Sequence, residues 1–171
     1  MSSNDDGRIC VAQEDANWAL RLEGDLRADK GAGLLQWIHG VMDQLNNDSR
    51  VVVDFAAVRL IDSTILGHLA RLAVMMADAS GERPIFVHAS DDIRHLLVNM
   101  GFEHIAVLEQ SDDSQLPHSF RAVDDVEETR DQGLQRVLAA HELLASLSEN
   151  NREAFKDVID HLRNSRSMAD S

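Results

Sequence analysis

The chain has 171 residues, enough for one domain of ordinary size and an additional segment. Its formal net charge of -14 disfavours binding to nucleic acid and to anionic membrane surfaces, because both carry negative charge. Cys10 is the only cysteine, which excludes an internal disulfide and a four-cysteine metal site.

The N-terminal region predicts a β-hairpin followed by a helix. Residues 1–8, MSSNDDGR, lack the apolar segment of a signal peptide, and no run approaches the roughly 18 apolar residues of a membrane span, so we expect a cytoplasmic protein. Strands are expected at 8–13 and 17–22, with Gly24-Asp25-Leu26 closing the second strand. Apolar residues at helical spacing then predict a helix over 29–46.

The next region alternates strands with helices. Residues 51–55 form a continuous apolar run with one acid, which is typical of a strand covered on both faces. A helix is expected over 63–79, followed by a strand at 84–88, a helix at 91–100 and a strand at 105–108. Helical crossovers between strands favour an α/β fold with a mixed β-sheet on which the helices pack.

The C-terminal part has a different organisation. A polar linker is expected at 111–121, after a first domain at 8–110. Apolar spacing over 123–147, and again from Ala154 to Leu162, predicts an α-helical hairpin, so we assign 122–165 to a helical extension and 166–171 to a flexible tail. The extension either covers an exposed surface of the domain or serves as a dimerisation or partner-docking element.

The sequence carries no recognisable catalytic or metal-binding pattern. The G-x-S-x-G motif is absent, the eight histidines are scattered singly, and Gly31-Ala32-Gly33 lacks the lysine of a phosphate-binding loop. Asp54 lies where a receiver domain keeps its phosphoacceptor, but the acidic pair and the lysine of that chemistry are missing from their places. We therefore expect a protein that is not an enzyme and that has no catalytic residues, metal or cofactor.

Two hydroxyl side chains, those of Ser63 and Thr64, lie at the start of the helix that follows the strand at 51–55. The simplest role for Asp62, Ser63 or Thr64 is to cap that helix. Gly67 follows within the helix, where glycine costs about 1 kcal/mol relative to alanine, so we interpret it as a position that another backbone or surface approaches. The face expected to be exposed and open to a partner consists of Thr64, Gly67, His68 and Arg71.

These residues resemble the STAS domain of anti-sigma factor antagonists. That family has a strand, an acid and then an Asp-Ser-Ser/Thr-Gly-Leu-Gly signature, which 51–55 and the run Ile61 to Gly67 match in the same order. Gly24-Asp25-Leu26 resembles the family's loop after its second strand, and Asp91 to Phe102 resembles its third helix and glycine turn. The resemblance spans residues 8–110 and implies a STAS-like α/β fold; Ile65 departs from it, because the family has glycine there.

The resemblance implies a protein-binding switch that acts in bacterial signal transduction, transcription regulation and stress response. In the family, the serine after the aspartate is phosphorylated by a kinase that is often the anti-sigma factor itself, and a PP2C-type phosphatase removes the phosphate. Carried over, the phosphoacceptor is Ser63. Partner contacts are then expected at Asp25, Leu26, Asp62, Thr64, Gly67 and His68.

The whole chain, including Ala140 to Leu144 and Asn151 to Phe155, is similar to a proteobacterial subgroup with a C-terminal helical extension. Those proteins are thought to work with response regulators that carry a phosphatase-like output domain. Two other functions stay open: a ligand-sensing STAS module, and a scaffold subunit of a signalling complex. A homodimer also stays open.

Overall fold

The computed structural model describes residues 6–110 and 116–169. A six-stranded sheet runs in the order β5-β4-β3-β2-β1-β6. Its strands are β1 (Arg8–Glu14), β2 (Asn17–Leu26), β3 (Arg50–Ile61), β4 (Ile85–Val87), β5 (Val107–Glu109) and β6 (Arg121–Ala122). The helices are α1 (Gly31–Met42), α2 (Ser63–Ser80), α3 (Asp91–Asn99), α4 (Arg130–Ser146) and α5 (Glu149–Ala169), with short 3-10 helices at Ala28–Lys30 and Phe102–His104. No helix in these residues is long and apolar enough to cross a membrane.

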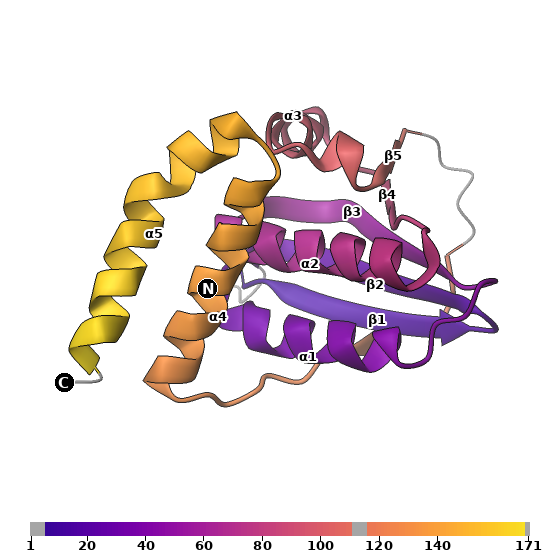
Figure 1. The fold of residues 1–171 in the computed structure, drawn as a ribbon. Helices are drawn as coiled ribbons and strands as arrows, with labels where there is room; N and C mark the ends of the chain where they lie inside the picture. The colour runs from indigo at the N-terminus through magenta and orange to yellow at the C-terminus, as the bar shows by residue number, and fades with distance from the viewer. Residues whose placement is uncertain (1–5, 111–115, 170–171) are drawn as a thin grey trace.

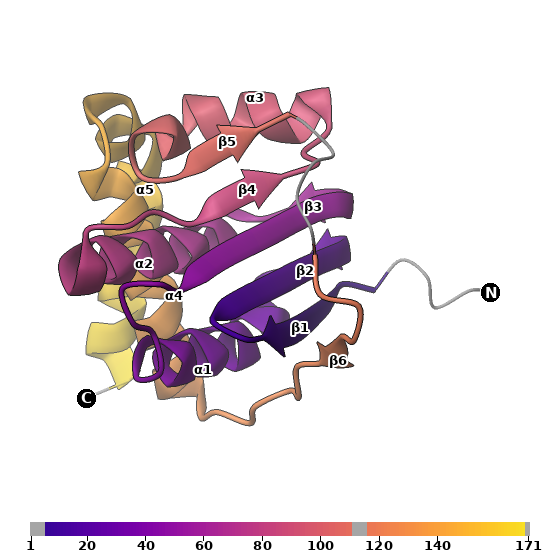
Figure 2. The ribbon, with the colours of Figure 1, turned by 90° about the vertical axis from the view of Figure 1, so that its right-hand side faces the viewer.

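The sheet is mixed, which confirms the predicted α/β architecture. Strand β1 is antiparallel to β2, whereas β2, β3, β4 and β5 are parallel to one another. The crossovers through α1, α2 and α3 all advance in the same direction along the sheet. Right-handed crossovers that advance in one direction place their helices on one face, and α1 and α2 lie together on that face (Figure 1; Figure 2).

Strand β3 is longer than predicted, and the extension sets the start of α2. It was expected at 51–55 but continues to Ile61, paired with β2 through two register shifts, so that Leu26 lies opposite Ile61. Irregular pairing of this kind bends a strand without ending it. Helix α2 therefore begins directly after the paired ends of β2 and β3.

The apolar run of β3 predicted a strand that is covered on both faces. In the structure, helices do not cover both faces of β3. On the face opposite α1 and α2, the buried carboxylate of Asp54 accepts a hydrogen bond from the Arg21 side chain at 3.3 Å. The ring of His88 and the backbone N–H of Ala56 also hydrogen-bond to it, each at 3.0 Å. Asp54 is thus a structural acid with several partners, which explains how a charge is tolerated in this run.

The C-terminal helices lie at the end of the sheet where α2 begins (Figure 1). The predicted helix over 123–147 starts later, at Arg130, because Thr129 and Gln132 form a capping box there. Helix α5 continues to Ala169, so most of the tail expected at 166–171 is helical, and residues 170–171 lie outside the described residues. Residues 111–115 of the predicted linker also lie outside the described residues. The last residue of that linker, Arg121, belongs to β6 and pairs with β1.

Candidate functional site

Asp62 caps helix α2, which decides between the three residues that could have done so. Its backbone is extended (φ -88°, ψ 170°), and its carboxylate accepts a hydrogen bond from the N–H of Ile65 at 3.0 Å. Its own N–H donates to the carbonyl of Leu26 at 3.0 Å. These bonds hold the start of α2 against the end of β2.

Ser63 is the first residue of α2, and its hydroxyl already has a partner within the chain. The distance from Ser63 Oγ to His141 Nε2 on α4 is 2.8 Å, and His141 Nδ1 lies 2.7 Å from the carbonyl oxygen of Val137. A carbonyl can only accept, so Nδ1 carries a proton, and in the neutral ring Nε2 is then the acceptor. The Ser63 hydroxyl therefore donates to His141.

This pair corrects one premise of the sequence reasoning, which found no base near the hydroxyls. A serine hydroxyl held by an imidazole nitrogen is the first requirement of a serine nucleophile. The pair joins residues that are 78 positions apart in the chain, so no local motif could have revealed it. His141 is only 5% exposed, which places its ring inside the contact between α2 and α4 rather than in an open cleft.

Gly67 lies one helical turn after Ser63, in direct contact with α4. A Cβ atom at this position would lie 2.6 Å from the Cβ and from the carbonyl oxygen of Ala140. No such approach is tolerated between real atoms, so the helices can pack this closely only because residue 67 has no side chain. The interpretation of Gly67 as a point of close approach is confirmed, and the approaching backbone is α4 of the same chain.

His68 completes the contact through a buried polar group. The Nη1 of Arg136 donates to His68 Nε2 at 3.1 Å, and the Nε of Arg136 donates to the carboxylate of Glu128 at 3.1 Å. Burial, and then the charges of Arg136 and Arg71, lower the pKa of His68 to about 3, so its ring is neutral at pH 7. The hydrogen bonds from Arg136 also lower the pKa of Glu128.

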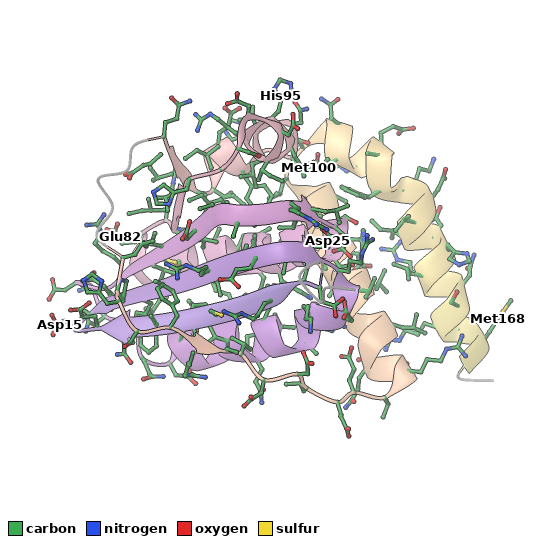
Figure 3. All side chains as sticks on the ribbon, turned by 180° about the vertical axis from the view of Figure 1, so that it is seen from behind. Asp15, Asp25, Glu82, His95, Met100 and Met168 are labelled. Carbon is green, nitrogen blue, oxygen red and sulfur yellow. The ribbon has the colours of Figure 1, made fainter. Side chains whose placement is uncertain are left out.

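Asp25 and Leu26 are the last residues of β2, not a loop after that strand, and they lie beside the start of α2. Asp25 forms an ion pair with Arg59 at 2.8 Å, and Figure 3 shows it at the end of the sheet nearest to α4 and α5. Leu26 is fully buried in the core. Ile65, the departure from the family pattern, is fully buried there too, so its side chain packs inward.

The face expected to be open to a partner is covered, and this is the main correction to the sequence reasoning. Thr64 and His68 are only 4% and 2% exposed, Gly67 is buried, and Arg71 is partly buried. Helix α4 lies over Gly67 and His68, and helical spacing within 63–79 contains no information about that helix. Sequence reasoning did not assign Arg136, Ala140 or His141 to the site, although Gly67 indicated a close approach and Ala140 to Leu144 belonged to the resemblance of the whole chain.

Across the described ranges, no three histidine, cysteine, aspartate or glutamate side chains gather in a way that could hold a metal ion. Of the expected site residues, Ser63, Asp62, Asp25 and Leu26 come together at the carboxyl ends of β2 and β3. The site is therefore a helix N-terminus with one hydroxyl, faced by a histidine from a distant helix.

No protein-family model matches the sequence, and no curated protein matches it. Among solved structures, the chain is similar to an anti-sigma factor antagonist from Mycobacterium paratuberculosis, with a TM-score of 0.55 and 20% sequence identity. The likeness covers 66% of this chain and 93% of that one. Nearly the whole neighbour is matched, and a third of this chain lies outside the match. The chain therefore has the STAS-type α/β fold that is also found in an anti-sigma factor antagonist.

Proposed function

We propose that this protein is an anti-sigma factor antagonist whose binding to its partner is controlled by phosphorylation of Ser63. The observation that carries the proposal is the position of this hydroxyl. Ser63 is the first residue of α2, directly after the acid that caps the helix, in a fold shared with an anti-sigma factor antagonist. The protein itself acts as a binding regulator in the bacterial cytoplasm, not as an enzyme.

The start of α2 is suited to hold a phosphate. The first N–H groups of a helix have no partner in its hydrogen-bond ladder, and the helix dipole favours an anion there. A phosphoserine adds about -1.5 to -2 charges and three acceptor oxygens at this point. In the reaction, the Ser63 Oγ–P bond forms as the bond to ADP breaks, and the hydroxyl proton passes to the kinase. The fold is expected to survive the modification.

The same phosphate would disrupt a partner contact. A partner surface that fits a neutral hydroxyl would have to desolvate a dianion beside the carboxylate of Asp62, and a loss of about 1.4 kcal/mol already weakens binding tenfold. The proposed partners are an anti-sigma factor with serine kinase activity and a PP2C-type phosphatase, the latter within a response regulator as in the proteobacterial subgroup. Neither nucleic acid nor a membrane is involved.

The proposal is tested by phosphate mapping. The tagged protein is incubated with ATP and an extract of the source cells, purified again, and examined by intact mass and peptide mapping. We expect one phosphate, on Ser63, and none on the Ser63→Ala variant. Thr64→Val is the matched control, because it removes the neighbouring hydroxyl, and it should still accept the phosphate. A phosphate on another residue, or a Ser63→Ala protein that is still modified, contradicts the proposal.

Binding to the partner supplies the second arm of the test. Proteins captured from the extract by the unmodified chain should be lost, at least tenfold, when Ser63 carries the phosphate. Equal capture by both forms would leave the modification without the proposed role.

The Ser63–His141 pair supports one competing function, that of a serine hydrolase. A nucleophile and a base within hydrogen-bond distance are present, but the base lies inside a helix–helix contact. A fluorophosphonate probe, which reacts with activated serines, separates the two functions. We expect no labelling of Ser63, whereas labelling that is lost in both Ser63→Ala and His141→Ala would favour the hydrolase.

A further inference from the structure

We propose that helix α4 is an internal cover of the Ser63 site, which must move away from α2 before a kinase or partner can reach the hydroxyl. This inference rests on the proposed function of Ser63, and it adds a step before recognition. In the described structure, helix α4 of the same chain occupies the surface that a partner would use (Figure 1).

The Ser63 hydroxyl already has a hydrogen-bond partner on α4. Ser63 Oγ donates its one hydrogen to His141 Nε2 at 2.8 Å, and the His141 ring is almost completely buried. A kinase must place the γ-phosphate of ATP about 3 Å from the attacking oxygen, in line with it. The imidazole ring fills the space on the side of Oγ that faces α4. Ser63 is itself only partly exposed, and transfer from the side of α4 requires that His141 first leaves this position.

Helix α4 also occupies the neighbouring surface of α2. Ala140 lies against the backbone of Gly67, and Arg136 lies against the ring of His68. Gly67 lies one helical turn after Ser63, and both Gly67 and His68 are residues for which a partner contact was expected. The cover and a partner would therefore compete for one surface.

The contacts that hold α4 in place are partly polar, and an irregular segment precedes the helix. Residues 123–129 form neither helix nor strand. At the other end, the Asn151 side chain donates to the carbonyls of Met100 and Leu144, each at 2.9 Å. Polar contacts of this kind can be exchanged for water at a modest net cost. Leu144, which is fully buried in the main core, and the partly buried Leu143, Leu147 and Phe155 are the apolar contacts that hold the cover against the rest of the chain.

Cysteine labelling measures the opening without a kinase. The only native cysteine, Cys10, is buried and is replaced by alanine in the background protein. The thiol of Ser63→Cys measures access to the covered site. The thiol of Leu66→Cys, in the core, becomes accessible on global unfolding. The thiol of Glu82→Cys, exposed at the other end of the molecule, gives the rate for an uncovered position (Figure 3). Each rate of reaction with dithionitrobenzoate is divided by the rate of the same variant in urea.

We expect the Ser63→Cys thiol to react more slowly than that of Glu82→Cys and faster than that of Leu66→Cys. Adding His141→Ala should accelerate the reaction at position 63 about tenfold, because one hydrogen-bond partner and one buried ring are lost from the cover. The matched control, His161→Ala on the exposed side of α5, should leave the rate unchanged.

Two results would overturn the cover. If position 63 is protected as strongly as position 66, then α4 separates only when the whole chain unfolds. If position 63 reacts as fast as position 82, the site is already open. Hydrogen exchange of the wild-type protein gives the same comparison without substitutions: α4 amides should exchange faster than those of β2 and β3.

Failure of the cover is distinguishable from failure of the proposed function. The labelling experiment contains no kinase, so phosphate mapped to Ser63 together with a closed or absent cover rejects only this inference. Conversely, phosphate mapped elsewhere rejects the function of Ser63 and leaves the measured opening of α4 intact.

Discussion

The pKa of His68 reflects the packing of α4 against α2. Its ring is almost fully buried between α2 and Arg136, and its pKa is lowered to about 3 from an ordinary value of 6.5. Between these two pH values the unfolded chain binds a proton that the folded chain excludes. A group of this kind lowers the stability of the folded state as the pH falls through that range.

The resulting prediction concerns the pH dependence of stability. From pH 6.5 toward pH 3, His68 should decrease the free energy of unfolding by up to about 1.4 kcal/mol per pH unit. His68→Gln, which keeps an acceptor for Arg136, should reduce this slope in urea unfolding series at several pH values. His161→Gln, on the exposed part of α5, is the control and should keep the wild-type slope. An unchanged slope in His68→Gln would show that His68 is not the buried neutral group.

At the level of the elements, the contact between α2 and α4 depends on a missing side chain. Glycine inside a helix is normally unfavourable, and alanine at such a position gains up to about 1 kcal/mol. At Gly67 this gain is opposed by the overlap of a new Cβ with the Ala140 backbone. Forcing an extra carbon into a packed contact costs about 1–3 kcal/mol, so the overlap is expected to dominate.

Gly67→Ala should therefore destabilise the protein by up to about 2 kcal/mol in urea unfolding, after the helix gain is subtracted. Chain geometry supplies a matched control at Gly40 in α1, where a Cβ would meet no atom within 4 Å. Gly40→Ala should stabilise the protein by about 0.5–1 kcal/mol. The contact between α2 and α4 would be looser than described if both substitutions changed stability with the same sign.

The hairpin of α4 and α5 joins the rest of the chain through both apolar and polar contacts. Leu144 enters the main core, whereas Leu138, Ala145 and Ile159 form a small separate cluster between the two helices. Asn151, 1% exposed, connects the turn of the hairpin to the end of α3 through Met100. The hairpin thus has contacts of its own in addition to those with α2, which is what a movable element requires.

On the scale of the whole molecule, the dominant electrostatic property is the net charge of -14. Self-repulsion of this size disfavours the compact state, and salt screens it. The exposed ion pairs, such as Arg163 with Glu142, act in the opposite direction, but each contributes only about 0–1 kcal/mol.

We therefore expect the melting temperature at pH 7.5 to rise between low salt and 0.5 M sodium chloride, a range that carries the screening length well below about 10 Å. The same series near the isoelectric point of about 4.8 is the internal control, because the net repulsion is absent there. A melting temperature that falls with salt at pH 7.5 would mean that the ion pairs outweigh the repulsion.

The order of strands and helices could be predicted from the sequence because its signals are local. Apolar periodicity and the acid before Ser63 act within a few residues along the chain. The errors have two different causes, one local and one in the pairing of strands. The start of α4 was placed too early because apolar spacing outweighed the Thr129 capping box, and β3 was ended too early because register shifts with β2 cannot be recognised in one strand.

By itself, then, the sequence determined an α/β sheet, a helical extension, and a hydroxyl at the first position of α2. Only the tertiary structure decided what faces that hydroxyl. His141, Ala140 and Arg136 reach α2 from about 70 positions further along the chain, because α4 packs across its start. A contact between two helices depends on how both faces fit in space, and no periodicity within either helix specifies its neighbour. For this reason, the face of α2 that helical spacing predicted to be open to a partner is covered by α4.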